Sequence, residues 1–223
     1  MRCRVIANRE DCDSGFVGMR LVEQGFELDL CVRESPREWS RVEKCDLILT
    51  LGSDWSVYWK SVSREVQAEL DLLVTAASRG VPIFAICFGA QVVAHAFGGT
   101  VLPASRLEIG WHQVFSSEYP HELQREWFQW HGDEFTAPRN FKVIAQNQNC
   151  NQAVLGPRVF ACQFHPEATP AMIARWMALG AADIARTNLK PHQLFESVVA
   201  RASATETSAA RLVDWFLNHS NST

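Results

Sequence analysis

The chain has 223 residues, of which 47% are hydrophobic and 21% charged, and its formal net charge is −4, values that are ordinary for one or two globular domains with a sizeable core. Because no clustered basic face accompanies this charge, we expect no nucleic-acid partner and no binding to an anionic membrane. Charged residues interrupt the N-terminus and polar residues break the apolar stretch around 81–99, so we expect neither a signal peptide nor a membrane span.

Strand and helix patterns alternate in the N-terminal half. In chain order, the predicted elements are a strand at 3–7, a helix at 15–24, strands at 26–32 and 46–51, and a helix at 63–79. The run at 46–51 is almost continuously Leu and Ile, as in strands that are buried on both faces. A strand at 83–86 then changes to a helical period after Cys87. This βαβ rhythm predicts a three-layer α/β/α fold with a mostly parallel central sheet.

The C-terminal half is predicted to complete the sheet and then to become helical. In chain order, we expect strands at 141–145 and 152–155, a β-rich run from Val159 that ends at Pro166, a helix at 172–180, and helical stretches at 191–200 and 208–217 linked by residues 202–205. We therefore expect residues 1–185 to form one domain and residues 186–223 to form a C-terminal helical extension packed on it.

Cys87 lies at the corner between a buried strand and a helix. Ala85 and Gly89 stand two places before and after it, and small residues at these places allow a sharp strand-to-helix turn. At the start of a helix, unpaired backbone N–H groups and the positive end of the dipole favour thiolate over thiol. The pattern predicts a nucleophile, whereas a buried and unreactive thiol is the alternative for a cysteine considered alone.

His165 and Glu167 lie at the end of the β-rich run that begins at Val159. A histidine at the end of a strand is placed to act as a base, and a carboxylate two residues later can hold its imidazole in one tautomer. We therefore predict a catalytic triad of Cys87, His165 and Glu167.

The two segments resemble the class I, or triad-type, glutamine amidotransferases, whose motifs are P-I-x-G-I-C-x-G-x-Q and Q-F-H-P-E. The chain carries the first motif at 82–91, with Ala85 in place of a glycine, and the second at 163–167. The resemblance covers roughly residues 4–180 and looks nearest to the amidotransferase part of GMP synthase. It implies a flavodoxin-like fold and a glutaminase reaction through a cysteinyl thioester, which needs no metal and no organic cofactor.

The resemblance also implies a substrate site. The backbone N–H groups of Ser53 and Phe88 stand where the family has its oxyanion hole, although the turn here is Gly-Ser-Asp instead of Gly-Gly-Pro. The other positions that would contact the glutamine are Gly52, Gln91, Trp130, His131, Gly132 and Asp133. Segments 98–101 and 108–111 resemble the turn and short strands that flank the pocket.

Other interpretations of these residues remain open on the sequence alone. The turn at 52–54 also fits a plain surface turn, and a lone glutamine on a helix, such as Gln91, usually faces solvent. His131 and Asp133 resemble a metal pair, but no third ligand has a matching spacing, so we expect no metal.

Three functions are compatible with this pattern. The first is an amidotransferase that takes L-glutamine and passes ammonia to a partner synthase, since the chain carries no Gly-rich phosphate loop of its own. The second is a γ-glutamyl peptidase or hydrolase that acts on other γ-glutamyl compounds; Trp55, Trp111 and Trp130 near the expected pocket would suit a larger leaving group. The third is a non-catalytic binding module that kept the fold, although all three triad positions are filled.

The seven cysteines, at 3, 12, 31, 45, 87, 150 and 162, are odd in number and scattered along the chain. This distribution fits a reducing compartment better than a disulfide framework. We therefore expect a cytoplasmic protein.

Overall fold

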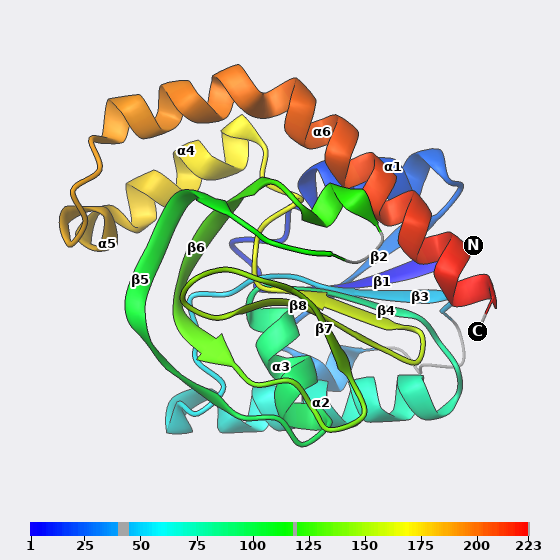
Figure 1. Ribbon diagram of the computed structural model, residues 1–223. Helices are drawn as coiled ribbons and strands as arrows, with labels where there is room; N and C mark the ends of the chain where they lie inside the picture. Colours follow the sequence, from blue (N-terminus) through cyan, green and yellow to red (C-terminus); the bar gives the residue numbers. More distant parts are fainter. Residues whose placement is uncertain (40–44, 118–119, 223) are drawn as a thin grey trace.

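A seven-stranded sheet forms the centre of the computed structural model, which describes residues 1–39, 45–117 and 120–222 (Figure 1). The strands are β1 (Arg2–Ala7), β2 (Glu27–Val32), β3 (Leu47–Thr50), β4 (Ile83–Ile86), β7 (Lys142–Gln146), β8 (Asn151–Gly156) and β9 (Val159–Cys162). They lie in the order β2-β1-β3-β4-β9-β8-β7. Pairing is parallel from β2 to β9 and antiparallel from β9 to β7. The carboxyl ends of the parallel strands therefore meet at one edge, where open α/β sheets bind ligands.

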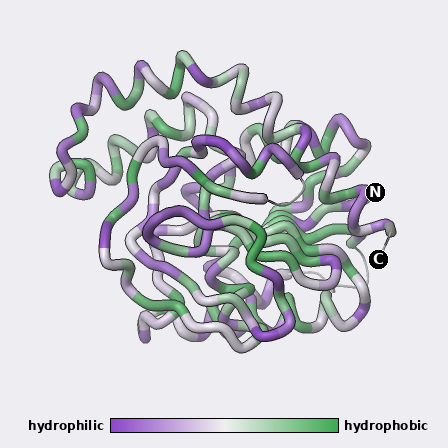
Figure 2. Tube along the Cα trace, in the orientation of Figure 1, coloured by the Kyte–Doolittle hydropathy of each residue, from purple (hydrophilic) through white to green (hydrophobic). Residues whose placement is uncertain are grey.

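Helices cover both faces of this sheet (Figure 1). They are α1 (Gly15–Glu23), α2 (Ser63–Ser78), α3 (Phe88–Ala96), α4 (Pro170–Leu179), α5 (Ala181–Ala185) and α6 (Pro191–Ser222), with short 3-10 turns at η1 (Pro36–Glu38), η3 (Lys60–Val62) and η4 (His121–Leu123). Successive residues of β4 point to opposite faces. Phe84 packs in a core with residues of α1 and α6, and Ile83 packs in a second core with residues of α2 and α3. The predicted three-layer α/β/α fold is confirmed, and Figure 2 shows hydrophobic residues gathered along its central strands.

A separate two-stranded sheet curves along one side of the central sheet (Figure 1). It consists of β5 (Val101–Gln113) and β6 (Glu126–Phe135). The pairing register shifts between Pro103 and Glu108, and such irregularities bend a strand. A third apolar cluster, which includes Ile109, Phe128, Ile173, Ile184 and Leu194, packs this sheet against α4, α5 and α6. The predicted short strand at 108–111 is thus one part of the longer β5.

The C-terminal helix differs from the expectation. α6 is one continuous helix of 32 residues, whereas the sequence predicts two stretches with a link at 202–205. Alanines in that link are strong helix formers, and Thr205 is buried with its hydroxyl donating to the carbonyl of Arg201, so the segment continues the helix. Nε and Nη2 of Arg20 on α1 donate to the two carboxylate oxygens of Asp214 on α6, which fastens α6 to α1. The domain boundary at residue 185 stays a prediction.

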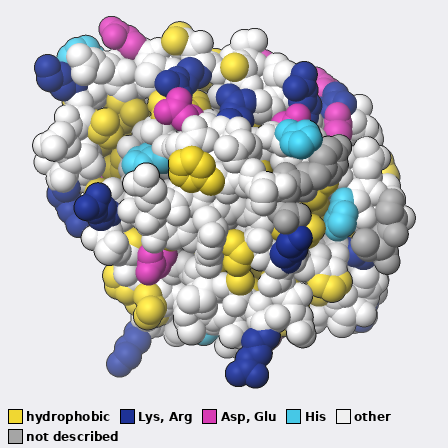
Figure 3. Space-filling model, in the orientation of Figure 1, with side chains coloured by type: hydrophobic (Ala, Val, Ile, Leu, Met, Phe, Trp, Pro, Cys, Tyr) yellow, Lys and Arg dark blue, Asp and Glu magenta, His cyan; other side chains and the backbone are white. Residues whose placement is uncertain are grey.

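The surface carries charges of both signs. On the face seen in Figure 3, lysine and arginine side chains are scattered among acidic and uncharged ones. Among the residues that the structure describes, none of the helices has the length and apolar content that crossing a membrane requires.

Candidate active site

Cys87 occupies a strained turn between β4 and α3. Its φ of 52° lies in the left-handed region that residues other than glycine rarely adopt. Its N–H donates to the carbonyl of Cys162 on β9 at 2.7 Å. Gly89 has no room for a side chain, because a Cβ there would lie 2.5 Å from the carbonyl oxygen of Thr50. Strain of this kind collects at functional sites, where the surrounding structure holds it in place.

His165 and Glu167 form a buried pair just after β9. Nδ1 of His165 lies 2.7 Å from Oε1 of Glu167, and the two residues are 3% and 1% exposed. The N–H of His165 donates to the carbonyl of Phe128 on β6, which fixes the backbone behind the ring. Nε2 of His165 is buried and has no hydrogen-bond partner among the described residues. This second ring nitrogen is therefore free to exchange a proton.

The charges around the imidazole favour its protonated form. Burial alone would lower the pKa of His165, but the neighbouring charges of Glu167 and Cys87 raise the pKa well above its ordinary value. A histidine that keeps its proton beside a cysteine stabilises the thiolate form of that cysteine. The electrostatics thus favour the imidazolium form of His165 beside Cys87.

Two glutamines connect the sulfur of Cys87 to helix α3. Nε2 of Gln163 donates to Sγ of Cys87 at 3.5 Å, and Nε2 of Gln91 donates to Oε1 of Gln163 at 3.3 Å. Gln91 is only 3% exposed, so it is not the solvent-facing side chain that a lone helical glutamine suggests. Gln163 belongs to the second motif but was given no role from the sequence, because its contact with the sulfur depends on the pairing of β4 with β9.

A cleft of about 860 Å³ opens beside Cys87. The structure brings nine of the eleven predicted site residues to its walls, namely Gly52, Ser53, Cys87, Gln91, Trp130, His131, Gly132, Asp133 and His165. The other two, Phe88 and Glu167, are each 1% exposed. Phe88 is the first residue of α3, and Glu167 is hydrogen-bonded to His165.

One wall of the cleft is built on β6. Asp133 is buried, and its carboxylate accepts hydrogen bonds from the hydroxyls of Ser56 and Tyr58 at 2.6 and 2.7 Å. Nδ1 of His131 lies 2.9 Å from the carbonyl oxygen of Asp133. Ser56 and Tyr58 are not predicted from the sequence, because they lie 77 and 75 residues from Asp133 along the chain and no local motif indicates a contact across that separation.

Tryptophans form the apolar part of the cleft. Trp55, Trp130 and Trp176 line it, and the Trp176 ring lies edge-on to the His165 ring with centroids 4.8 Å apart. The expected place of Trp111 near the pocket is wrong. Its Nε1 donates to Ser197 of α6, its ring lies edge-on to the Phe128 ring in the third apolar cluster, and it does not line the cleft.

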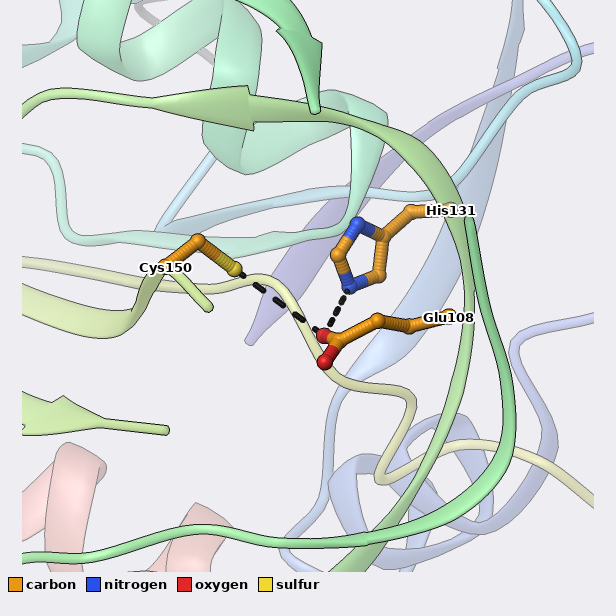
Figure 4. Close-up of side chains that lie close together, drawn as sticks. All are labelled: Glu108, His131 and Cys150. Carbon is orange, nitrogen blue, oxygen red and sulfur yellow. Dashed lines mark hydrogen bonds and ion pairs between the residues drawn. The ribbon is translucent and has the colours of Figure 1, made fainter. Parts of the chain in front are cut away.

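Glu108, His131 and Cys150 form a second group of polar side chains (Figure 4). One ligand atom from each lies within 4.8 Å of the others, so this group is the candidate metal site among the described residues. Its chemistry does not fit that role, because amide groups of Asn147 and Asn149 already donate to the Glu108 carboxylate. Burial raises the pKa of the Cys150 thiol to about 12, which opposes the thiolate that a metal needs.

This second group also lacks the order of a nucleophile relay. In Figure 4 the carboxylate of Glu108 lies between the sulfur of Cys150 and the imidazole of His131. A relay requires the imidazole to lie between the sulfur and the carboxylate. Burial would raise the pKa of Glu108, but hydrogen bonds from His131 and Asn149 outweigh it and lower the pKa to about 2. The group is therefore a buried anionic centre that joins β5, β6 and the turn before β8.

A known protein family matches more than half of the chain. The family model described as glutamine amidotransferase class-I matches residues 22–176. The chain belongs to this family.

Relatives of this amidotransferase chain include GMP synthases [glutamine-hydrolyzing]. The one from Bdellovibrio bacteriovorus is 33% identical over 156 residues, which are 68% of this chain and 29% of that protein. The one from Aromatoleum aromaticum is 34% identical over 116 residues, which are 44% of this chain and 22% of that protein. The chain thus spans less than a third of the length of these relatives.

A solved structure supports the fold over almost the whole amidotransferase chain. The crystal structure of a glutamine amidotransferase from Thermotoga maritima covers 97% of both chains with a TM-score of 0.87 and 22% identity. The structural likeness therefore includes α6, which lies beyond the segment that the family model matches.

Proposed function

We propose that this amidotransferase hydrolyses the side-chain amide of L-glutamine through a thioester on Cys87, giving glutamate and ammonia. The observation that supports this proposal most strongly is the buried pair of His165 and Glu167 beside a cysteine held in a strained turn at the wall of a cleft. Cys87 is the nucleophile, His165 the acid and base, and Glu167 the group that orients and charges the imidazole.

The reaction proceeds by two displacements at the amide carbon. The thiolate of Cys87 attacks this carbon, and the imidazolium of His165 gives its proton to the nitrogen as the C–N bond breaks and ammonia leaves. The neutral imidazole then takes a proton from a water molecule that attacks the thioester. The C–S bond breaks, glutamate leaves, and the imidazolium–thiolate pair is restored.

The backbone N–H groups of Ser53 and Phe88 are the proposed donors to the oxyanion in both steps. Phe88 is the first residue of α3, and the N–H groups of a first helical turn have no intrahelical acceptor. A Cβ at Gly52 would lie 3.2 Å from Cε1 of His165 and 3.7 Å from Cβ of Cys87, so the turn that carries Ser53 is in contact with the reacting groups. Each such donor lowers a barrier of this type by about 3 kcal/mol.

The amino-acid end of the glutamine is proposed to bind between α3 and β6. The polar groups on these walls belong to Gln91, His131, Gly132 and Asp133. The carboxylate of Asp133, held by the two hydroxyls described above, is a suitable acceptor for an α-ammonium group. No metal or organic cofactor takes part in the proposed reaction.

The ammonia is proposed to be used by a partner synthase subunit. Relatives named GMP synthase carry a glutamine-hydrolysing activity together with a synthase activity, as their names say. A cytoplasmic location, as expected from the cysteines, belongs to the same proposal.

A larger γ-glutamyl compound is the second candidate substrate. The cleft volume of about 860 Å³ lies near the upper end of the roughly 300–1,000 Å³ that pockets for drug-sized ligands have. Trp130 and Trp176 offer an apolar wall to the part of such a substrate that would leave in place of ammonia. This hydrolase would use the same triad.

Glutamate release from L-glutamine by the purified chain tests the proposal. We expect turnover that falls to less than about one ten-thousandth in Cys87→Ala, as when the nucleophile of a triad is removed, and is unchanged in Cys12→Ala, which alters an exposed cysteine. Release only from γ-glutamyl peptides would identify the hydrolase instead. No turnover of any of these compounds, with or without an added synthase, would favour the non-catalytic module.

A further inference from the structure

Arg33 is a fully buried cation directly beneath the turn that carries Ser53. It follows β2, it is 0% exposed, and its Nε pairs with Oε2 of Glu69 on α2 at 2.8 Å. Glu69 is equally buried, and its other oxygen accepts from the hydroxyl of Thr50 at the end of β3. Burying two charges is costly unless hydrogen bonds satisfy them, so a site of this kind calls for an explanation.

The remaining donors of the guanidinium hold the turn after β3. Nη2 of Arg33 donates to the carbonyl of Leu51 at 3.0 Å, and Nη1 donates to the carbonyl of Gly52 at 3.2 Å. Nη1 also donates to Oδ1 of Asn8 at 2.5 Å. Two successive carbonyl oxygens of the turn therefore face the same buried cation.

The orientation of these carbonyls decides the direction of the next N–H. A trans peptide unit is planar, and its C=O and N–H point in opposite directions. Because the Gly52 oxygen points to Arg33, the N–H of Ser53 in the same peptide unit points away from Arg33. Gly52 lies against Cys87 and His165, and Ser53 lines the cleft.

The same guanidinium contacts the residue that carries the other proposed donor. Its central carbon lies 4.8 Å from the centroid of the Phe88 ring, a distance at which a cation and an aromatic face attract each other. One buried cation thus contacts the two segments whose N–H groups are proposed to bind the oxyanion.

We infer that Arg33, neutralised by Glu69, is a positioning residue that sets the Gly52–Ser53 peptide so that its N–H faces the reacting carbon. The inference rests on the proposed glutaminase or γ-glutamyl hydrolase chemistry of Cys87. Arg33 lies beneath the turn and acts on the substrate only through the Ser53 amide.

The test replaces both charges of the pair, so that no unpaired charge stays in the core. In Arg33→Met/Glu69→Met we expect kcat to fall by about 100- to 1,000-fold, as when one oxyanion donor is lost, while KM changes less than about threefold. Arg33→Lys keeps the charge but cannot reach all of these acceptors at once, and we expect it to recover part of the lost kcat. Arg20→Met/Asp214→Leu, which removes the α1–α6 ion pair between two residues that do not line the cleft, is the matched control.

Two further measurements separate this role from a general effect on the fold. An aldehyde analogue of the substrate forms a tetrahedral adduct with an oxyanion, so its affinity should fall together with kcat. Alkylation of Cys87 by iodoacetamide forms no oxyanion, so its rate should not change. A parallel loss of alkylation would overturn the inference, because Arg33 would then act on the thiolate.

Crystal structures of the wild type and of Arg33→Met/Glu69→Met decide the inference even where turnover is absent. We expect the Gly52 carbonyl to leave its wild-type direction in the variant. An unchanged Gly52–Ser53 peptide, or an unchanged kcat in an active enzyme, would sink the inference and leave the proposed function standing. A wild type that turns over neither glutamine nor another γ-glutamyl compound, with or without an added synthase, would instead remove the proposed function.

Discussion

Glu167 and Glu108 are two buried carboxylates that serve different parts of the cleft. Glu167 bonds to His165 through Oε1, and its Oε2 has no hydrogen-bond partner among the described residues. Glu108 instead accepts from several amides and from His131. The Glu167 carboxylate therefore interacts mainly with the imidazole next to Cys87. The Glu108 carboxylate instead shares its charge among several hydrogen-bond donors.

Glu167→Gln tests the charge at His165. Because the Glu167 carboxylate raises the pKa of His165, its loss should lower this pKa and move the alkaline limb of the kcat/KM profile to lower pH. The pH dependence of kcat/KM for glutamine measures this shift, and Glu206→Gln, a change at an exposed position of α6, is the control. An alkaline limb that stays in place would show that the limb does not report His165.

The same pair predicts a pH dependence of stability. The folded-state pKa of His165 is raised, so protonation of His165 stabilises the folded protein. This contribution to the unfolding free energy is fully present below the unfolded-state pKa of about 6.5 and is lost as the pH rises through the folded-state pKa. We expect the difference in unfolding free energy between the wild type and Glu167→Gln to shrink over that upward range. Denaturant unfolding at several pH values measures it; a difference that grows with rising pH would contradict the assignment.

At the scale of elements, Glu108 joins three parts of the chain around the cleft. It lies on β5, His131 lies on β6, and Asn147 and Asn149 lie in the turn between β7 and β8. This turn belongs to the central sheet, so the Glu108 carboxylate fastens the curved second sheet to the first. The wall of the cleft that carries residues 130–133 depends on this attachment.

Glu108→Gln should therefore destabilise the protein in a pH-dependent manner. The pKa of Glu108 is lowered to about 2 in the folded protein. The contribution of its ionised carboxylate to the unfolding free energy is therefore present above the unfolded-state pKa of about 4.3 and is lost as the pH falls toward 2. A shift of this size corresponds to a loss on the order of 3 kcal/mol at neutral pH. Denaturant unfolding at pH 7 and pH 3 measures it.

The control for this change is Glu126→Gln on β6, where the carboxylate is 47% exposed and pairs with Arg201. Surface pairs of this type contribute about 0–1 kcal/mol. Equal losses in the two variants, or a loss in Glu108→Gln that does not shrink at low pH, would contradict the role of Glu108.

At the scale of the whole molecule, the strand order of the sheet brings the predicted site residues together. β3, β4 and β9 are neighbours and parallel, so the turns that follow them meet at one edge. Gly52, Cys87 and His165 come from these three turns. The two apolar cores on opposite faces of the sheet pack against residues at this edge, among them Leu51, Cys87 and Phe88.

For the isolated chain we expect glutamate and ammonia to appear in equal amounts from glutamine. Hydrolysis of the thioester by water releases both products to solution in the absence of a synthase. A coupled assay of each product on one sample measures the ratio. Addition of a synthase partner should lower only the free ammonia, and a shortfall of ammonia without any partner would contradict simple hydrolysis.

The sequence indicated the parts of the site that depend on local pattern. Periodicity predicted β4, α3 and the three-layer fold, since buried strands and amphipathic helices have recognisable spacings. The motifs indicated Cys87, His165 and Glu167 as a triad, and the structure brings His165 and Glu167 within hydrogen-bond distance. Boundaries were less well predicted, as in α6, because packing against α1 and α4 decides whether a polar stretch stays helical.

The sequence by itself determined the fold class and the sharp strand-to-helix turn at Cys87, because these follow from neighbours within a few positions of one another. Only the tertiary structure revealed Ser56 and Tyr58 against Asp133, the centre at Glu108, and Arg33 beneath the turn at Gly52. Each of these contacts joins residues far apart along the chain, and a side chain that acts through such a contact leaves no local signature. The physical reason is that strand order and register, not the spacing of residues along the chain, decide which distant groups share a buried site.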